Sequence, residues 1–234
     1  MHPLACRMIC DLGGHFAHQP SFESHLLEDS NRHSYIRQLF WLCYINDKDI
    51  ALRAGKPPLL TTDYCDLSLP DWTDIVHGAS GTESARGLTQ DPHLSIIKEK
   101  ACRILHSPST FKLPDSRLLW NIRELDDDLE RWRLSIPAWM RPQLNVQSNR
   151  LNMPAQATEL QKMQCMNLQL DYLYMLINIH TTVRRCGTNH RDESMAEDLH
   201  SVVHSSIDLS LEAARSTLRF LMAGTSALGA HAIQ

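Results

Sequence analysis

The chain has 234 residues, of which 43% are hydrophobic and 21% are charged, and its formal net charge at pH 7 is −4. This composition is that of an ordinary globular protein, which excludes a wholly disordered chain. A protein that binds nucleic acid by itself usually has a basic excess or a basic stripe, because phosphate neutralisation supplies most of its affinity. The sequence has neither, so we expect no direct DNA contact from this chain.

The cysteines lie far apart and at irregular intervals. No two of them have the two-residue spacing of a zinc knuckle, and their odd number does not suit a closed disulfide framework. We therefore expect free thiols in a reducing compartment, and we predict no metal ligand and no cofactor in the chain. The N-terminal residues lack the pattern of a secretory signal, and no apolar run is long enough to span a membrane. The cysteines are Cys6, Cys10, Cys43, Cys65, Cys102, Cys165 and Cys186.

Apolar residues recur with the helical period along most of the chain, and an alternating strand pattern is almost absent. The sequence therefore predicts an all-α fold, a bundle of several helices in one domain over residues 1–234. Asp91 followed by Pro92 and the cap at Asp115 predict two of the helix starts. Helices are expected over residues 4–11, 30–53, 91–105, 115–132, 156–185 and 193–222, with a loop at 71–90 that is rich in Gly, Ser, Thr and Asp.

Both ends of the chain interrupt this helical pattern abruptly. The first helix starts within a few residues of Met1, and the residues after Met222 form a mixed apolar tail with no packing partner in view. We therefore expect the chain to be a piece of a longer protein.

Residues 37–70, here called the signature segment, are the most informative stretch of the sequence. The segment starts in an aromatic-rich helix whose end is predicted at Gly55, a residue suited to the left-handed conformation after a helix. Pro57 and Pro58 prevent the helix from continuing, and an acidic loop follows.

The signature helix has a broad apolar face and a charged edge. The apolar face predicts a core helix, with Trp41 and Tyr44 supplying a large buried area. Asp49 and Arg53 are spaced for an i,i+4 ion pair. The apolar face contains Tyr35, Ile36, Leu39, Phe40, Leu42, Cys43 and Ile50, and the charged edge contains Arg37, Asp47, Lys48, Asp49 and Arg53.

The order of these features carries a family resemblance. An arginine lead-in, a Phe-Trp pair, an aspartate followed by a basic residue, a Gly-basic-Pro-Pro turn and an acidic loop ending in proline closely resemble the signature of the fungal-specific transcription factor domain. That domain is the all-helical regulatory middle-homology region of fungal zinc binuclear cluster transcription factors. Gln38 stands where a second arginine is usual, and a lysine replaces the common arginine in the turn. The matching residues are Arg37, Phe40, Trp41, Asp47, Gly55, Lys56, Pro57, Pro58 and Pro70.

Three shorter elements are also similar to this family. Trp132 with Ile136 and Pro137 resembles its tryptophan-apolar-proline element. Residues 168–180 resemble its long tyrosine-bearing helix, and residues 213–215 resemble its small-residue packing helix. The family's paired cysteines with intervening basic residues have no counterpart, so zinc is expected only in a cluster domain outside this chain.

The resemblance implies a nuclear, non-enzymatic domain that regulates transcription by RNA polymerase II. It would act through the transcriptional machinery or a regulatory protein, or by binding a small-molecule effector, and it would contact DNA only through another domain. The resemblance also allows a homodimer. It does not identify the target genes or distinguish an activator from a repressor. These implications rest on analogy at the level of the family.

Two alternatives remain beside this interpretation. The chain could be a non-functional fragment of such a factor. Alternatively, Asp126, Asp127 and Glu130 resemble part of a magnesium site of a helical enzyme, although the second carboxylate motif that such an enzyme needs is not found. His200 and His204 have the spacing of a metal-binding pair, but a polar helix face explains them as well.

Overall fold

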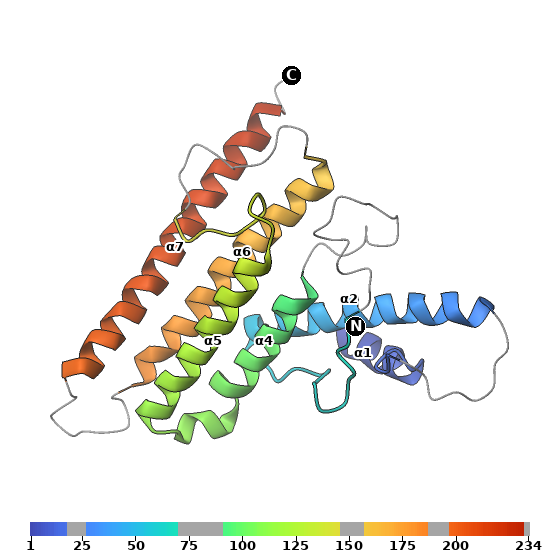
Figure 1. Cartoon of the computed structure of the whole chain (residues 1–234), viewed down its shortest axis with the longest axis horizontal. Coiled ribbons are helices and arrows are strands. Elements are labelled where there is room, and N and C mark those ends of the chain that lie inside the picture. The colour runs from blue at the N-terminus through green and yellow to red at the C-terminus, as the bar shows by residue number, and fades with distance from the viewer. Residues whose placement is uncertain (18–26, 70–90, 146–156, 187–196, 232–234) are drawn as a thin grey trace. The chain divides into compact units, whose positions relative to one another are not determined.

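The computed structural model describes residues 1–17, 27–69, 91–145, 157–186 and 197–231, and within these ranges it contains helices and loops but no β-strand (Figure 1). The predicted all-α fold is confirmed. None of the helices described in these ranges is long and apolar enough to cross a membrane. The elements are α1 (His2–Asp11), α2 (Leu27–Ala54), α4 (Pro92–Leu105), the 3₁₀ helix η2 (Pro108–Lys112), α5 (Asp115–Ser135), α6 (Glu159–Thr181), the 3₁₀ helix η3 (Thr182–Arg185) and α7 (Glu197–His231).

The chain divides into two compact units. Unit 1 comprises Met1–Arg103 and unit 2 comprises Ile104–Gln234. The single regulatory domain expected from the sequence stays a prediction. The loop predicted at 71–90 lies wholly outside the described residues.

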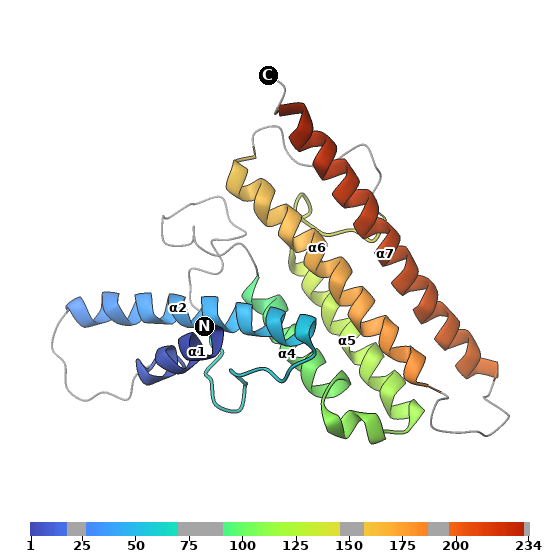
Figure 2. The ribbon, with the colours of Figure 1, turned by 180° about the vertical axis from the view of Figure 1, so that it is seen from behind.

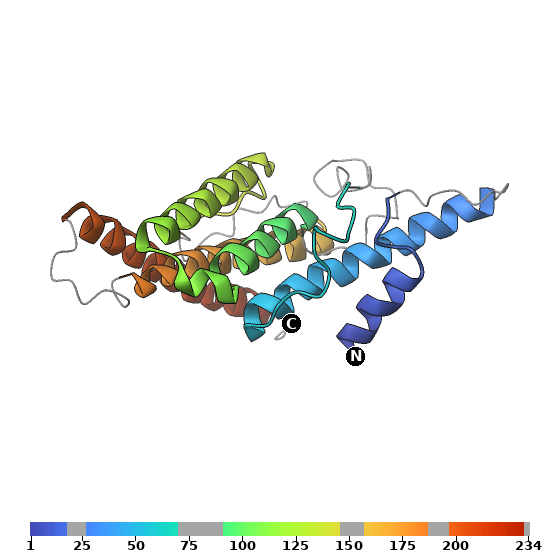
Figure 3. The same cartoon turned by 90° about the horizontal axis from the view of Figure 1, so that it is seen from below.

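In unit 1, α1 packs against α2, as Figures 1 and 3 show. A tight turn follows α1, in which Gly14 N–H donates to the Ile9 carbonyl at 2.9 Å. A Cβ atom at Gly14 would lie 2.9 Å from a side-chain atom of Ile9, so this turn requires glycine for close approach. The core beneath the two helices and the following loop contains Cys6, Ile9, Ile36, Phe40, Trp41, Tyr44, Leu60 and Cys65.

The end of α2 follows the sequence prediction. Gly55 has a φ angle of +61°, and the N–H of Lys56 donates to the carbonyl of Ala51 at 3.0 Å, the long bond of a Schellman motif. Pro57 and Pro58 then carry the chain into the loop of residues 55–69.

Helix α4 starts where the Asp91-Pro92 pair predicts. The Asp91 carboxylate accepts a hydrogen bond from the N–H of His93 at 2.8 Å, which satisfies one of the unpaired donors of the first turn. Leu94 and Ala101 of the predicted apolar face are buried, while Ile97 is only half-buried.

In unit 2, α5, α6 and α7 lie side by side and alternate in direction (Figures 1 and 2). Pro114 rather than the predicted Asp115 is the N-cap of α5. A capping box between Thr158 and Gln161 starts α6, later than predicted, and the predicted single helix ends at Thr181 before η3. Since residues 193–196 lie outside the described ranges, only the C-terminal end of α7 tests the prediction, and it extends to His231 instead of Met222.

Small side chains cover the buried face of α7. A serine or alanine recurs at intervals of three or four residues, which places these residues on one face of the helix. Small residues let two helices approach closely, so α7 packs against α6 through backbone proximity as much as through side-chain bulk. The buried residues of this face are Ser206, Ser210, Ala213, Ser216 and Phe220.

Candidate functional site: a buried charged network in unit 1

The charged edge predicted on α2 is wrong for three of its residues. Arg37, Asp47 and Lys48 are buried, and Lys48 is 0% exposed. Buried charges are tolerated only where they are paired and hydrogen-bonded. The chain that follows α2 supplies those partners, and the sequence pattern of the helix alone could not reveal them. We call Arg37, Tyr44, Asp47, Lys48, Asp49, Lys98 and Glu99 the charged network.

Asp47 fixes the chain immediately after the double proline. Its carboxylate accepts hydrogen bonds from the N–H groups of Leu59 at 2.9 Å and Leu60 at 3.0 Å. Lys48 donates to Asp47 at 2.8 Å and also to the Leu60 carbonyl, while its ammonium lies 4.1 Å from the centre of the Tyr44 ring. One anion and one cation therefore satisfy polar backbone groups of Leu59 and Leu60, of which only Leu60 is buried.

Arg37 links three segments that are distant in the sequence. Its guanidinium donates to the carbonyls of Gly14 at 2.9 Å and Ser68 at 3.0 Å, and to the carbonyl of Asp66. The same group lies 4.6 Å from the centre of the Phe40 ring, a cation–π distance. Burial lowers the pKa of Arg37, but an arginine stays protonated at neutral pH.

Glu99 of α4 completes the network. The Tyr44 hydroxyl donates to one of its carboxylate oxygens, and the N–H and hydroxyl of Thr62 donate to the other at 2.9 and 3.0 Å. Burial, followed by the bond to Glu99, raises the pKa of Tyr44 above its ordinary value. Asp49 pairs with Lys98 at 2.6 Å. These bonds tie α2, the loop and α4 together. The i,i+4 pair of Asp49 with Arg53 stays a prediction.

An aromatic cluster lies beneath this network. The rings of Phe40, Trp41 and Tyr44 are fully buried, with centroids between 5.3 and 5.9 Å apart. The predicted core role of Trp41 agrees with this burial, although its indole N–H has no hydrogen-bond partner. Tyr35 and Ile50, predicted on the apolar face, are instead exposed.

The remaining signature residues lie at the surface of the turn. Gly55, Lys56 and Pro57 are exposed, and Pro58 is half-buried. Pro70 lies outside the described residues. The structure therefore divides the signature into a buried part that contains Arg37, Phe40, Trp41 and Asp47, and an exposed turn.

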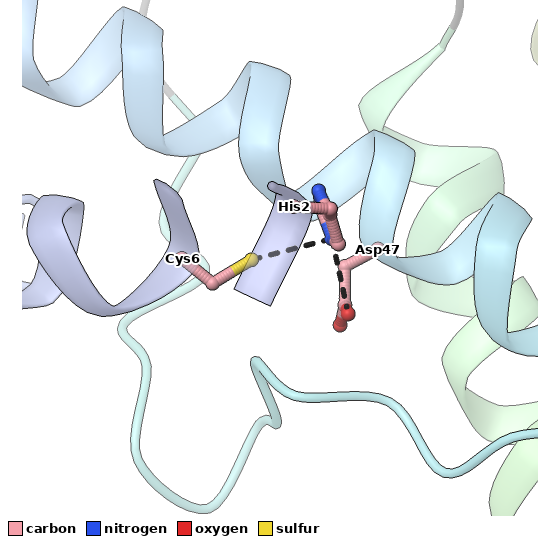
Figure 4. Close-up of side chains that lie close together, drawn as sticks. All are labelled: His2, Cys6 and Asp47. Atoms are coloured by element: carbon pink, nitrogen blue, oxygen red, sulfur yellow. Dashed lines mark hydrogen bonds and ion pairs between the residues drawn. The ribbon is translucent and has the colours of Figure 1, made fainter. Parts of the chain in front are cut away.

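A second feature of unit 1 was not predicted. His2 and Cys6, one turn apart on α1, lie beside Asp47 of α2, and the three side chains point toward one another (Figure 4). Burial, followed by the charge of Asp47, raises the pKa of Cys6 to about 12. The i,i+4 spacing of His2 and Cys6 was the only signal in the sequence, since Asp47 is 45 positions away from His2.

Two of the three carboxylates of the alternative magnesium site have separate partners. Asp126 lies 3.3 Å from Nε2 of His180, whose other ring nitrogen lies 3.3 Å from the Ser206 hydroxyl. Arg133 binds Glu130 at 2.7 Å, and this hydrogen bond lowers the pKa of Glu130. Asp126, Asp127 and Glu130 do not converge as a ligand group; of the residues described, only the His2 group does.

Comparison with known proteins finds fungal regulators. An ABC-transporter-regulating transcription factor of Aspergillus fumigatus is 32% identical over 118 residues, which cover 48% of this chain and 13% of that protein. A transcription factor of the same name from Aspergillus oryzae matches over the same length with the same identity. An uncharacterized transcriptional regulatory protein of Schizosaccharomyces pombe is 27% identical over 167 residues, or 63% of this chain and 26% of the relative.

The match thus covers a small part of each relative, about 13% of the length of the two Aspergillus proteins. No protein-family profile matches the chain, and no solved structure does. The chain is therefore similar to fungal transcriptional regulators over about half of its length.

Proposed function

We propose that this chain is a regulatory module of a fungal transcription factor, of the fungal-specific transcription factor domain type, and that it acts in the nucleus. The observation that carries the proposal is the similarity over 118 residues to two factors named as regulators of ABC transporters. The order of motifs in the signature segment supports it. The net charge of −4 supports a role in which DNA is contacted through another part of the factor.

The charged network suits a module whose chemistry is confined to binding. It fixes the loop of residues 55–69 to two helices and leaves the outer side chains of the loop free to contact a partner. Tyr64 is 82% exposed, and Leu59, Lys56 and Pro57 of the same loop are also exposed. An exposed tyrosine on a rigid loop supplies a large contact area at a low entropic cost. We assign this loop surface to a partner from the transcriptional machinery, a regulatory protein or a second copy of the chain.

The Asp126, Asp127 and Glu130 carboxylates have a structural role in this proposal. Asp126 connects α5 to His180 of α6, Glu130 binds Arg133 of α5 itself, and Asp127 is exposed. The relatives are named as transcription factors and not as enzymes. A small-molecule effector would act by changing the partner contact.

The experiment joins the chain to a heterologous DNA-binding domain in a fungal host that carries a reporter gene. We expect reporter transcription to differ from that driven by the DNA-binding domain alone. Tyr64→Ser should reduce the difference, whereas Trp120→Ser, a change of another exposed aromatic residue in unit 2, should leave it intact. Transcripts of ABC transporters are the first readout for the full factor, because the relatives are named for them.

A fusion that is helical and monodisperse but drives the reporter at the level of the DNA-binding domain alone would contradict the proposal. Aggregation of the 234-residue chain, with no helical fold, would instead favour the non-functional fragment. Circular dichroism and size-exclusion chromatography separate these outcomes, and chromatography also reports whether the chain dimerises.

A further inference from the structure

Three metal-binding side chains converge in unit 1. His2 Nε2 lies 3.4 Å from Asp47 Oδ1 and 3.3 Å from Cys6 Sγ, and all three ligand atoms lie within 4.8 Å of one another (Figure 4). An imidazole nitrogen, a thiolate sulfur and a carboxylate oxygen are each good zinc ligands.

The two short contacts share one nitrogen. A neutral imidazole nitrogen is either a donor or an acceptor, so Nε2 cannot donate to Asp47 and accept from the Cys6 thiol in the same state. A thiol activated by a histidine and an aspartate would use the two ring nitrogens in sequence, one for each partner. The arrangement here therefore favours a shared point between the three atoms over a catalytic relay. A cation at that point satisfies all three.

The two separations measured from His2 fit such a cation, and the third is within 4.8 Å. With bonds of about 2.3 Å to sulfur and 2.0–2.2 Å to nitrogen and oxygen, tetrahedral zinc places its ligand atoms roughly 3.3–3.6 Å apart. The separations from His2 Nε2 are 3.3 and 3.4 Å. We propose that His2, Cys6 and Asp47 bind one divalent ion of the zinc class, with water in the fourth position.

The surroundings hold the ligands in place. Oδ2 of Asp47 accepts from the Leu60 N–H and from Lys48, and the Leu59 N–H lies 2.9 Å from Oδ2 and 3.1 Å from Oδ1. These bonds fix the carboxylate, and Oδ1 keeps a second lone pair for the direction of His2. The thiolate and the carboxylate together balance the charge of the ion, although the Lys48 ammonium lies on the far oxygen of the same carboxylate. The His2 side chain is 21% exposed and gives the ion a path from solvent.

Such an ion would fasten α1 to α2. The inference departs from the sequence prediction that the chain binds no metal. It depends only on residues of unit 1 and would survive the failure of the proposed regulatory function.

Cobalt(II) titration of the whole chain tests the site. The protein is prepared without a polyhistidine tag and with a free N-terminus, because a tag beside His2 would supply competing ligands. We expect one Co²⁺ per chain, a thiolate-to-cobalt charge-transfer band and the intense visible bands of four-coordinate cobalt, all displaced by Zn²⁺. Removing a ligand by His2→Ala or Cys6→Ser should weaken binding by at least about 10–100-fold.

Two matched variants control for other thiols and histidines. Cys10→Ser, on the same helix, should keep the charge-transfer band, and so should His200→Ala combined with His204→Ala, the exposed pair on α7. The proposal is overturned if the wild-type chain shows no thiolate band. It is equally overturned if the band persists in Cys6→Ser or disappears in Cys10→Ser. Because His2 is at the surface end of α1, His2→Ala should retain the helical circular dichroism, so loss of its cobalt spectrum cannot come from unfolding.

Discussion

The two units bury different kinds of polar groups. Among the described residues, unit 1 buries cations and carboxylates such as Lys48, Lys98 and Glu99, whereas most polar groups buried in unit 2 are uncharged, including Asn121 and Ser216. Charges in unit 1 fasten a loop whose backbone would otherwise be unsatisfied, while unit 2 joins long helices through close packing. The two all-helical units are therefore stabilised differently. Unit 1 should be sensitive to the removal of one member of a buried charge pair, and unit 2 to a larger side chain between its helices.

The largest difference is expected between two tryptophans. Trp41 is fully buried in unit 1, and Trp120 on α5 is 49% exposed. Trp41→Ala should lower the free energy of unfolding by about 3–5 kcal/mol, because it leaves a large cavity. Trp120→Ala should cost less than about 1 kcal/mol. Urea unfolding measures both, and similar losses would mean that Trp41 is not a core residue.

Removing one partner of the charged network is the next largest effect. Asp47→Ala leaves Lys48 buried without its anion and two loop N–H groups unsatisfied, so we expect a loss of about 3 kcal/mol. Asp127 of unit 2 is exposed and supplies the control, so Asp127→Ala should change the free energy of unfolding by no more than about 0.5 kcal/mol. Hydrogen exchange should show the loss at residues 59–60; equal protection in both variants would rule out a holding role for Asp47.

Added volume should harm unit 2 instead. Ala213 is fully buried on the small-residue face of α7, so Ala213→Leu should cost about 2 kcal/mol by forcing α7 away from α6. Its half-buried neighbour supplies the control, since Ala214→Leu has room to extend toward solvent. Thermal unfolding of the pair tests this, and a stabilised Ala213→Leu would show that the two helices are not closely packed there.

A backbone effect should be smaller. No atom lies within 4 Å of the place where a Cβ atom would stand at Gly55, so the cost of Gly55→Val comes from its φ of +61° alone. We expect about 1 kcal/mol, and less for Gly55→Asn, which tolerates this conformation better. Denaturant midpoints of the two variants decide the point, since an equal cost would remove the conformational explanation.

The free energy of unfolding of unit 1 should fall gradually as the pH becomes alkaline. Burial raises the pKa of Cys65 and of Cys102 from an ordinary 9.0 to about 11. A group whose pKa is raised on folding stabilises the protein fully below its unfolded pKa, and this contribution is lost as the pH rises from about 9 toward 11. Urea midpoints across this range should fall for the wild type and fall less for Cys65→Ala and Cys102→Ala. A flat profile in the wild type would contradict the burial of these thiols.

Local sequence rules predict much of the fold because they act over a few residues. Gly55, the double proline and Asp91 specify helix ends through backbone geometry and capping, and each is observed. The N-terminal limit of α6 differs because the capping box at Thr158 defines a later start than periodicity suggested.

The site was harder to predict because its partners are distant. An amphipathic interpretation places charges toward solvent, yet Arg37 and Asp47 face inward to reach backbone groups many residues away. Tyr35 and Ile50, predicted on the core face, are exposed. His2 and Asp47 meet only through the packing of α1 on α2, which no local pattern in the sequence encodes.

The partners of Arg37 and Asp47 are mainly backbone atoms, namely the carbonyls of Gly14 and Ser68 and the N–H groups of Leu59 and Leu60. The loop can therefore change many of its side chains without losing these bonds. Proline at position 59 or 60 is the exception, since it removes the N–H that Asp47 requires. Unit 1 thus combines a fixed backbone frame, set by two charged side chains, with loop side chains that are free to diverge.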